Sequence, residues 1–432
     1  MAKKEITIQG LNGKVDEMAL TTNNRNYNLE KCARMLFPQN GETTPKLRFK
    51  GFEGEWDKAR ASDLFVTFNE RNRPDLPVLS ACQDIRGMAV RSDSGYDISH
   101  NRSNEVTYKV VKPGQFVIHL RSFQGGFAHS AVEGITSPAY TVFGFKDPSK
   151  HDDYFWKTIF MSKVFINRLK TITYGIRDGR SISFAEFAEM EFSFPIFEEQ
   201  HCIASLIRSL DEQIAVQQQQ LERLKQMKQA CLNSLFPDNQ QFTPPRLRFK
   251  GFEDQWITMK FSDMVHRVST SDISNELPSV EFEDIVAGEG VLNKDIYRKN
   301  VIKRGIRFDD HDVLFGKLRP YLKNILFAEF KGVAVGDFWV LRTTGLVDPY
   351  FLYILVSSES FMKVANVSSG SKMPRADWNL VSNSYFLIPS STEEQCRISS
   401  FFRTLDKKIS IQSHQVEKLT QLKKACLNKI IA

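Results

Sequence analysis

Two long stretches of the chain carry apolar residues at alternating intervals of four and three positions. The first begins with Ile203, Ile207 and Leu210, and the second begins with Ile398 and Phe402. Apolar side chains that recur every 3.5 residues form a narrow stripe, which is buried against another helix. The pattern therefore predicts two long helices, over 199–237 and over 393–432.

The two stripes are interrupted by polar residues at the same two places. Gln217 and Lys228 stand in the first stripe, and Gln412 and Lys423 stand in the second. Such residues cost stability but fix the register between paired helices. Because the interruptions match, we expect the helices to pair with each other. The path of the chain then makes the pair antiparallel, with a module at either end of a rod of roughly 50 Å. The alternative is a coiled coil that joins separate copies of the protein.

The segments before each helix alternate short apolar runs with turn residues. "QFVIHL", "YTVFGF", "VLFGKL" and "DFWVLR" are typical of strands, and proline and glycine pairs separate them. The apolar spacing in "DYFWKTIFMSKVFINRLK" and in "DPYFLYILVSSESFMKVAN" predicts one amphipathic helix in each half. The expected fold class is α+β, with two tandem modules joined by two long antiparallel helices in a pseudo-two-fold repeat.

The whole chain is duplicated. "PKLRFKGFEGEW" at Pro45 returns as "PRLRFKGFEDQW" at Pro245, and the "EEQ" that ends at Gln200 returns at Gln395. Aligning "PGQFVIHLRSF" with "HDVLFGKLRPY" sets Arg121 opposite Arg319. The predicted divisions are an N-terminal arm over 1–44, modules over 45–198 and 238–392, and helices over 199–237 and 393–432. We expect the "LFP" of the N-terminal arm to complete the repeat, because the second helix stops before its own "FP".

The modules differ freely between these shared landmarks. "FNERNRPDLPVLSACQDIRGMAVRSDSGYDISH" of the first module stands where the second has "VSTSDISNELPSVEFEDIVAGEGVLNKDIYRKN". A common framework with divergent inserts is what two readers of different targets would have. Neutral drift after duplication would give the same pattern.

Composition and charge narrow the class of protein without deciding it. The 432 residues are 41% hydrophobic and suit two or three packed domains, with no apolar run long enough for a membrane span. The first residues lack the apolar core of a signal peptide, so we expect a cytoplasmic protein. A net charge of +7 permits a polyanionic partner but does not require one.

Motifs of catalysis and metal binding are missing. The sequence has no phosphate-binding GxxxxGK[ST], no HExxH and no GxSxG. The SxxK matches at Ser360 and Ser369 lack their companion motifs, and "FDDHD" at Phe308–Asp312 is more typical of a turn than of a metal site. We therefore predict a binding protein with neither a catalytic residue nor a metal site.

The order of motifs resembles a known family. "LRFKGF…W", a variable module, "YGIRDGRSISF…EQ" and a helix with "LD..I" and "L..LK..K" occur in sequence and then repeat. This arrangement resembles the specificity (S) subunit of type I restriction–modification systems, from about Asn28 to the end of the chain.

The resemblance implies a non-catalytic DNA-recognition subunit. Each module would be a target-recognition domain that reads one half of a gapped site in double-stranded DNA, and the helices would set the gap. Two methyltransferase (M) subunits and the restriction (R) subunits would be its partners. S-adenosylmethionine, ATP and Mg would be bound by those partners, with no cofactor on this chain.

The positions expected to contact DNA are mainly arginines, because their bidentate fork suits guanine and phosphate. Lysines add charge, and Tyr174 lies beside the glycine-punctuated loop. The second module departs from the family pattern with "SSGSKMPRADW" in place of "YGIRDGRSISF". The predicted DNA-binding residues are Arg121, Tyr174, Arg177, Arg180, Lys317, Arg319, Lys372 and Arg375. Looser candidates in the inserts are Arg71, Arg73, Arg86, Arg304 and Arg307.

Other readings remain open for these residues and for the chain. A single arginine can instead be a solvated surface residue or part of an internal ion pair. The rival function is a coiled-coil adaptor that joins two proteins without touching DNA. A third possibility is an orphan S-like protein that captures foreign methyltransferase subunits.

Overall fold

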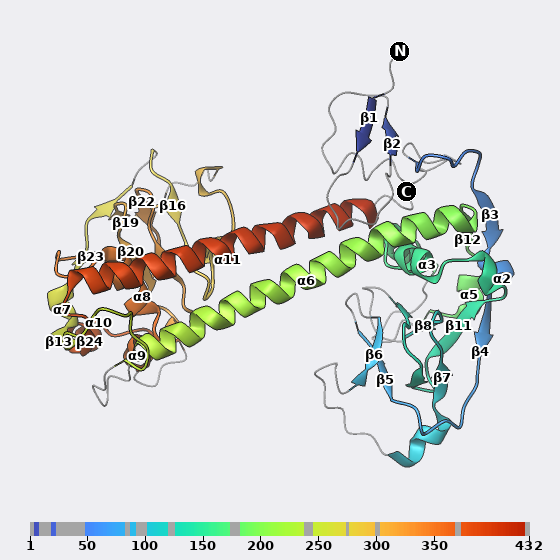
Figure 1. Cartoon of the computed structure of the whole chain (residues 1–432), viewed down its shortest axis with the longest axis horizontal. Helices are drawn as coiled ribbons and strands as arrows, with labels where there is room; N and C mark the ends of the chain where they lie inside the picture. Colours follow the sequence, from blue (N-terminus) through green and yellow to red (C-terminus); the bar gives the residue numbers. More distant parts are fainter. Residues whose placement is uncertain are drawn as a thin grey trace. The chain divides into compact units, whose positions relative to one another are not determined.

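The computed structural model describes residues 4–7, 19–22, 48–82, 87–91, 102–119, 126–172, 182–236, 245–273, 276–298, 303–367 and 373–427. Two compact units divide the chain: Met1–Gln218 with His414–Ala432, and Gln219–Ser413. Each unit contains one module and one half of each long helix (Figure 1). The predicted module boundaries at 198 and 392 stay a prediction, because this division cuts the helices near their middles.

The first module is built on a four-stranded antiparallel sheet in the order β4-β11-β8-β9. A second pair, β3 with β12, joins the two ends of the module, and two small pairs, β5 with β6 and β7 with β10, carry part of the insert. The elements are β3 (Asp57–Arg60), α2 (Ala61–Leu64), β4 (Phe65–Phe68), β5 (Leu79–Ala81), β6 (Met88–Val90), β7 (Lys109–Val111), β8 (Phe116–Ile118), β9 (Phe127–His129), β10 (Gly134–Thr136), β11 (Thr141–Phe145), α3 (Asp153–Phe160), α4 (Lys163–Ile172), α5 (Phe184–Ala188) and β12 (Glu191–Phe194). A separate hairpin pairs β1 (Lys4–Thr7) with β2 (Ala19–Thr22).

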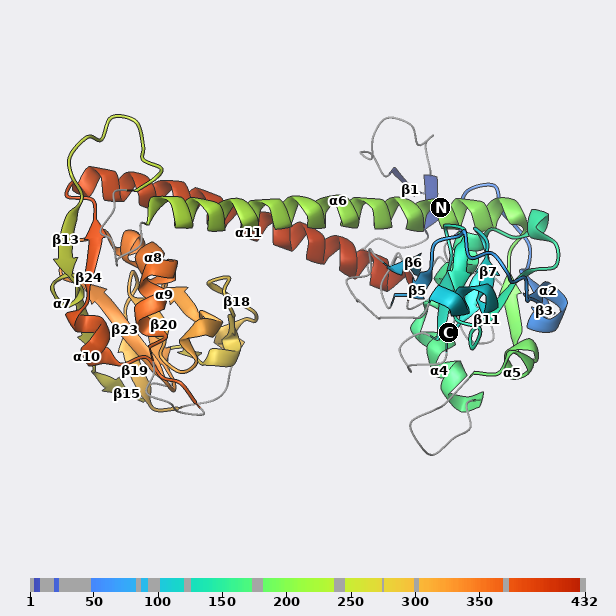
Figure 2. The same ribbon diagram turned by 90° about the horizontal axis from the view of Figure 1, so that it is seen from below.

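The second module repeats this plan (Figure 2). Its four-stranded sheet has the order β14-β23-β20-β21, and β13 pairs with β24 as β3 pairs with β12. Its insert forms a second four-stranded sheet, β15-β19-β22-β16, whose outer pairings appear in the first module only as the isolated bridges Arg71↔Lys109 and Val78↔Ile135. The elements are β13 (Ile257–Lys260), α7 (Phe261–Met264), β14 (Val265–Val268), β15 (Ser271–Asp272), β16 (Ser279–Val280), β17 (Ile285–Val286), β18 (Val291–Leu292), β19 (Gly305–Phe308), β20 (Val313–Gly316), β21 (Ile325–Phe327), β22 (Gly332–Ala334), β23 (Phe338–Thr343), α8 (Pro349–Ser357), α9 (Glu359–Ala365), α10 (Trp378–Asn383) and β24 (Tyr385–Ile388).

The strands confirm the predicted α+β class and the duplication, but they correct its register by one residue. Gly114 and His311 both have positive φ, 82° and 71°, and donate to the carbonyls of Ser130 and Ala328. These two residues therefore correspond, whereas the sequence alignment had set Pro113 against His311. The equivalence of Arg121 and Arg319 does not follow from the strands. Arg121 itself lies outside the described residues.

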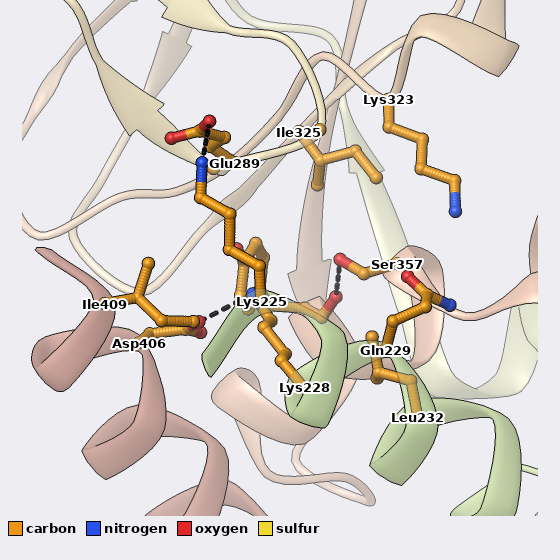
Figure 3. A pocket seen from close by; sticks show the side chains of 13 residues that line it. Lys225, Lys228, Gln229, Leu232, Glu289, Lys323, Ile325, Ser357, Asp406 and Ile409 are labelled. Atoms are coloured by element: carbon orange, nitrogen blue, oxygen red, sulfur yellow. Dashed lines mark hydrogen bonds and ion pairs between the residues drawn. The ribbon is translucent and has the colours of Figure 1, made fainter. Parts of the chain in front are cut away.

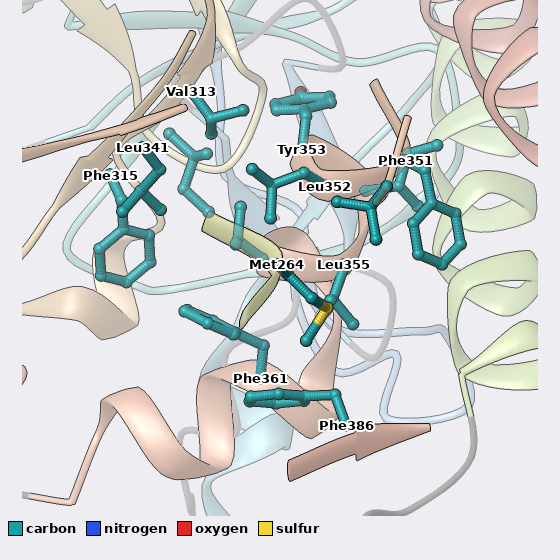
Figure 4. Close-up of a cluster of buried hydrophobic side chains, with 14 of the residues drawn as sticks. Met264, Val313, Phe315, Leu341, Phe351, Leu352, Tyr353, Leu355, Phe361 and Phe386 are labelled. Atoms are coloured by element: carbon teal, nitrogen blue, oxygen red, sulfur yellow. The ribbon is translucent and has the colours of Figure 1, made fainter. Parts of the chain in front are cut away.

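Aromatic and aliphatic side chains fill the core of each module. In the second, the sheet residues Phe315 and Leu341 pack against α8 and α9, and both are fully buried (Figure 4). Phe351 and Phe361, from those two helices, have 0% of their surface exposed. Removing such a side chain from water contributes roughly 1.5–3 kcal/mol. The core therefore holds the sheet and its loops in a fixed orientation.

Each predicted amphipathic helix is two helices, which corrects the sequence expectation. The apolar spacing continues across the break, but a serine at each break caps the second helix. Ser162 accepts the backbone N–H of Phe165 at 3.1 Å, and Ser358 accepts that of Phe361 at 3.3 Å. A hydroxyl that satisfies a helical N–H favours a helix start at that point.

The two long helices form as predicted, α6 over Phe197–Leu235 and α11 over Thr392–Leu427. In the first unit, Ile203 and Ile207 of α6 share a core with Leu419 and Leu422 of α11. In the second unit, the C-terminal part of α6 shares a core with the N-terminal part of α11. The pairing is therefore antiparallel, as expected. The "LFP" of the N-terminal arm lies outside the described residues.

Candidate nucleic-acid interface

Three of the predicted DNA-binding residues lie together in the second module. Lys317 and Arg319 belong to the loop between β20 and β21, and Arg375 belongs to the segment that precedes α10. The other five predicted positions fall outside the described residues, and they are Arg121, Tyr174, Arg177, Arg180 and Lys372.

Left-handed backbone shapes the β20–β21 loop. Arg319 has φ of 50° and Lys323 has φ of 52°, on either side of a short 3-10 turn over Pro320–Leu322. Non-glycine residues rarely adopt such angles, and the conformation costs of order 1 kcal/mol each unless the surroundings fix it. Lys323 donates to Glu359 at 2.6 Å, which anchors the end of the loop. The loop is therefore held in one shape with Arg319 exposed at its start.

Backbone hydrogen bonds join this loop to the segment that carries Arg375. The N–H of Arg319 donates to the carbonyl of Pro374, and the N–H of Ala376 donates to that of Lys317, both at 2.8 Å. These bonds flank an isolated antiparallel bridge between Leu318 and Arg375. Two segments far apart in the sequence thus present their cations on one small surface.

Asp337 lies between two of these cations. Its carboxylate is 3.5 Å from the Lys317 ammonium and accepts from Arg375 Nη2 at 3.0 Å and Nε at 3.3 Å. The guanidinium of Arg319 has no partner among the residues that the structure describes. The surface therefore combines two cations that share one carboxylate with a third cation, Arg319, which suits contact with both base edges and phosphates.

The described residues near the corresponding strands of the first module have different chemistry. Lys109 Nζ donates to the carbonyl of Tyr140 at 2.6 Å, and the Tyr140 ring lies 6.2 Å from that of His119. Burial lowers the pKa of His119, and burial followed by the charge of Arg71 lowers that of Lys109. Sequence reasoning missed Lys109 and His119 because neither stands in a motif.

The recurring "LRFKGF" and "EEQ" motifs tie each module to its long helix. Arg48 forms two bonds to Glu199, at 2.7 and 2.6 Å, and Arg248 forms two to Glu394, at 2.7 and 2.8 Å. Both glutamates are 1% exposed. These shared residues therefore serve the fold rather than DNA reading.

Matching polar networks lie where the two long helices pair. In the first unit, Asp211 of α6 binds Lys423 of α11 at 2.5 Å and accepts the hydroxyl of Tyr154 at 2.6 Å. In the second, Asp406 of α11 binds Lys228 of α6 at 2.6 Å. Tyr350 donates to Asp406 at 2.9 Å and completes the same arrangement. The lysines that interrupt the apolar stripes therefore pair with the aspartate of the opposite helix.

This architecture occurs in known proteins, although no protein-family profile matches the chain. The specificity subunit of the type I restriction enzyme MjaIX from Methanocaldococcus jannaschii is 22% identical over 291 residues, covering 63% of this chain and 67% of that protein. The crystal structure of the type I restriction–modification S subunit from M. genitalium superposes with a TM-score of 0.58 at 13% identity, covering 88% of this chain and 96% of that one. The chain therefore has the fold of a type I restriction–modification S subunit. The HsdS subunit from Thermoanaerobacter tengcongensis superposes less well, with a TM-score of 0.40 at 15% identity, covering 87% of this chain and 96% of that one.

Across the described ranges, no helix is both long and apolar enough to span a lipid bilayer.

The acidic "FDDHD" turn binds cations of the protein itself. Arg342 donates to Asp312 at 2.8 and 2.6 Å and to Asp309 at 2.8 Å, and Lys331 lies 3.5 Å from Asp309. The hydrogen bond to Asp312 raises the pKa of Arg342. The carboxylates stabilise the turn before β20, so they support the loop that carries Lys317.

The looser candidates of the inserts have mixed surroundings. Arg73 donates to Asp75 at 2.9 and 2.7 Å, and Arg71 donates to Asn69 at 3.1 Å. Arg307 lies 3.9 Å from Asp272, and Arg304 is exposed. Arg86 falls outside the described residues. None of these four described arginines joins the surface formed by Lys317, Arg319 and Arg375 through a bond that the structure shows.

A cavity of about 170 Å³ lies in the second unit beneath the β20–β21 loop (Figure 3). Lys225 reaches Glu289 at 2.6 Å across it, and Lys323 of the loop lines its edge. The pair of Lys228 and Asp406 forms another part of its wall. Each of its three lysines has a carboxylate partner, Lys323 pairing with Glu359 outside the lining. The cavity separates the loop from the helix pair.

Proposed function

We propose that the chain is the DNA-recognition subunit of its complex and that each module reads one half of a bipartite, gapped site in double-stranded DNA. The observation that carries the proposal is that the same sheet order recurs, β4-β11-β8-β9 and β14-β23-β20-β21, while the residues that follow the corresponding strands differ in sequence. His119 leads into the loop of the first module, whereas Lys317 and Arg319 lie in that of the second. Two copies of one framework with different contact residues suit two different half-sites.

The long helices then set the distance between the half-sites and provide the docking surface for two methyltransferase subunits. The paired Asp–Lys networks support this role, because a helix pair with a defined register gives a defined spacing. The restriction subunits join the same complex, which acts on DNA in the cytoplasm. S-adenosylmethionine, ATP and Mg are bound by those partners.

A module exchange tests this function. Residues 60–195 are replaced by the matching segment of a family member with a different target, and the full chain is purified with its methyltransferase partner. Footprinting and methylation mapping should show a change in one half-site only, with the other half and the gap retained. A change in both halves, or in neither, contradicts the two-reader arrangement.

The salt dependence of binding separates DNA recognition from the adaptor function. Phosphate contacts release counterions, so the affinity for the site should fall steeply between about 50 and 200 mM salt. A chain that binds its methyltransferase subunits but shifts no genomic fragment at any salt concentration is an adaptor.

A further inference from the structure

We propose that Arg375 reads a guanine in the half-site of the second module and that Asp337 is the residue that positions it. The inference rests on the proposed function and names the base pair that this module requires, a G·C pair at one position. Arg319, which lies beside them, would serve as a phosphate contact.

The geometry of the ion pair leaves the reading edge of Arg375 free. Nε and Nη2 of Arg375 both face one oxygen of Asp337, at 3.3 and 3.0 Å. The guanidinium has five N–H donors, so its outer edge, formed by Nη1 and the second hydrogen of Nη2, has two donors left. Two parallel donors match O6 and N7 of guanine in the major groove. With 53% of its side chain exposed, Arg375 is open to that contact.

Asp337 is itself held in place by the framework. Its carbonyl accepts the N–H of Lys317 at 2.8 Å, and the turn before it uses Gly336 at φ of 99°. Phe338, the next residue, stacks on Phe282 with ring centroids 4.4 Å apart. The carboxylate is 28% exposed, so it is fixed at the edge of the sheet instead of moving in solvent. An arginine paired with it loses less freedom when it binds a base.

The charges distinguish a base reader from a phosphate anchor. A carboxylate about 3 Å from a guanidinium cancels much of its charge and repels a phosphate oxygen, whereas a neutral base edge is not repelled. Arg375 has such a carboxylate beside it, and Lys317 shares it. Arg319 has none within the described part of the chain. Arg375 therefore suits base reading, and Arg319 suits the phosphate backbone.

The first module provides an internal comparison. The strand pairings of β10 with β7 and of β11 with β8 match those of the second module, and they set Ala139 at the position of Asp337. Alanine cannot orient an arginine. The first module therefore lacks this carboxylate, and the substitution Asp337→Ala installs in the second module the residue that the first already has.

The test uses the full chain in complex with its methyltransferase subunits and a DNA library randomised in both half-sites. Binding-site selection on the wild type should enrich a G·C pair at one position of the second half-site. Asp337→Ala and Asp337→Asn should each lower discrimination at that position by about tenfold. Arg375→Lys keeps the charge but loses the fork, so it should relax the same position with an unchanged salt dependence.

A matched control removes a carboxylate from another exposed pair of the same module. Asp295 lies 3.1 Å from Arg298. The substitution Asp295→Asn removes one negative charge, as Asp337→Asn does, but away from the surface formed by Lys317, Arg319 and Arg375. It should leave the selected sequence unaltered. If Asp337→Ala and Arg375→Lys select the same G·C pair as stringently as the wild type, the inference about Arg375 is wrong, while the proposed function stands. Failure of the wild type to select any bipartite site overturns the proposed function.

Discussion

Lys157 of α3 is a buried ammonium beside the helix pairing of the first unit. Burial lowers its pKa to about 8; the charge of Asp211 partly opposes this shift, and the charge of Lys423 adds to it. Asp153 and Arg208 also face the group. Tyr353 stands at the corresponding position of the second module. The centre of its ring lies 5.9 Å from the ammonium nitrogen of Lys228. The first unit therefore carries an extra cation in the same network.

The lowered pKa predicts how stability depends on pH. The unfolded chain keeps the proton of Lys157 up to about pH 10.5, whereas the folded chain releases it near pH 8. Higher pH in this window therefore favours the folded state. Lys157→Met should be more stable than the wild type at pH 7, by up to about 3 kcal/mol, and the advantage should shrink between pH 8 and 10.5. Urea unfolding at pH 7, 8.5 and 10 measures this, and a constant difference would contradict it.

Arg48 offers a prediction with a control in the same unit. Arg48→Ala leaves Glu199, which is 1% exposed, as a buried carboxylate without its guanidinium, and should destabilise the first unit by about 3 kcal/mol. Arg60→Ala removes the partner of Glu189, but both side chains are more than 60% exposed, so the cost should stay within about 1 kcal/mol. Thermal unfolding of the full chain compares the two. Equal losses of stability in the two variants would mean that Arg48 does not stabilise the buried Glu199.

At the scale of elements, the helix pairing depends on charge order. Asp211→Lys places two ammonium groups together in a site where Asp211 is 6% and Lys423 is 13% exposed, so it should cost about 3 kcal/mol or more. Combining it with Lys423→Asp restores opposite charges and should recover most of the loss. Denaturant unfolding of the single and double variants measures the coupling.

The second unit supplies the matched pair for that experiment. Lys228→Asp with Asp406→Lys exchanges the same charges between the same two helices. Because the two networks repeat, the single and double variants should follow the same order of stability there. If the double variant is no more stable than the single variants, the lysine and the aspartate do not stabilise the helix pairing through their opposite charges.

The elements show how far the sequence could predict this fold. Periodicity gave the long helices and the main strands, because burial on one face repeats at a fixed interval. Periodicity predicted one continuous helix where the structure has two, one on either side of Ser162 and of Ser358. Each serine acts through a single capping bond, which leaves no periodic signal. The partners of Lys228 and Lys423 could have been found, because both helices repeat an aspartate at the same register.

The candidate site was predictable only in part. Lys317, Arg319 and Arg375 were chosen as cations near a motif, and the structure brings them together. Asp337 was missed, because it comes from the turn before β23 and no sequence interval links it to Arg375. Contacts between segments that are distant in sequence depend on the sheet register, which the alignment had placed one residue off.

At the scale of the whole molecule, the boundaries of the sequence repeat differ from the boundaries of the two compact units. The sequence repeats as a module followed by a helix, yet each compact unit combines one module with halves of both helices. Leu419, Leu422 and Ala425 of α11 belong to the core that Ile203 and Ile207 enter. A module is therefore completed by residues from the other copy of the repeat.

This division has a consequence for the order in which the molecule forms on the ribosome. The first module leaves the exit tunnel early, but its core includes side chains of α11 that are translated some two hundred positions later. Until then the N-terminal part of the apolar stripe of α6 is exposed to solvent. Translation thus leaves the first unit incomplete until the end of α11 is made, whereas the second unit, the continuous segment Gln219–Ser413, is complete before that point.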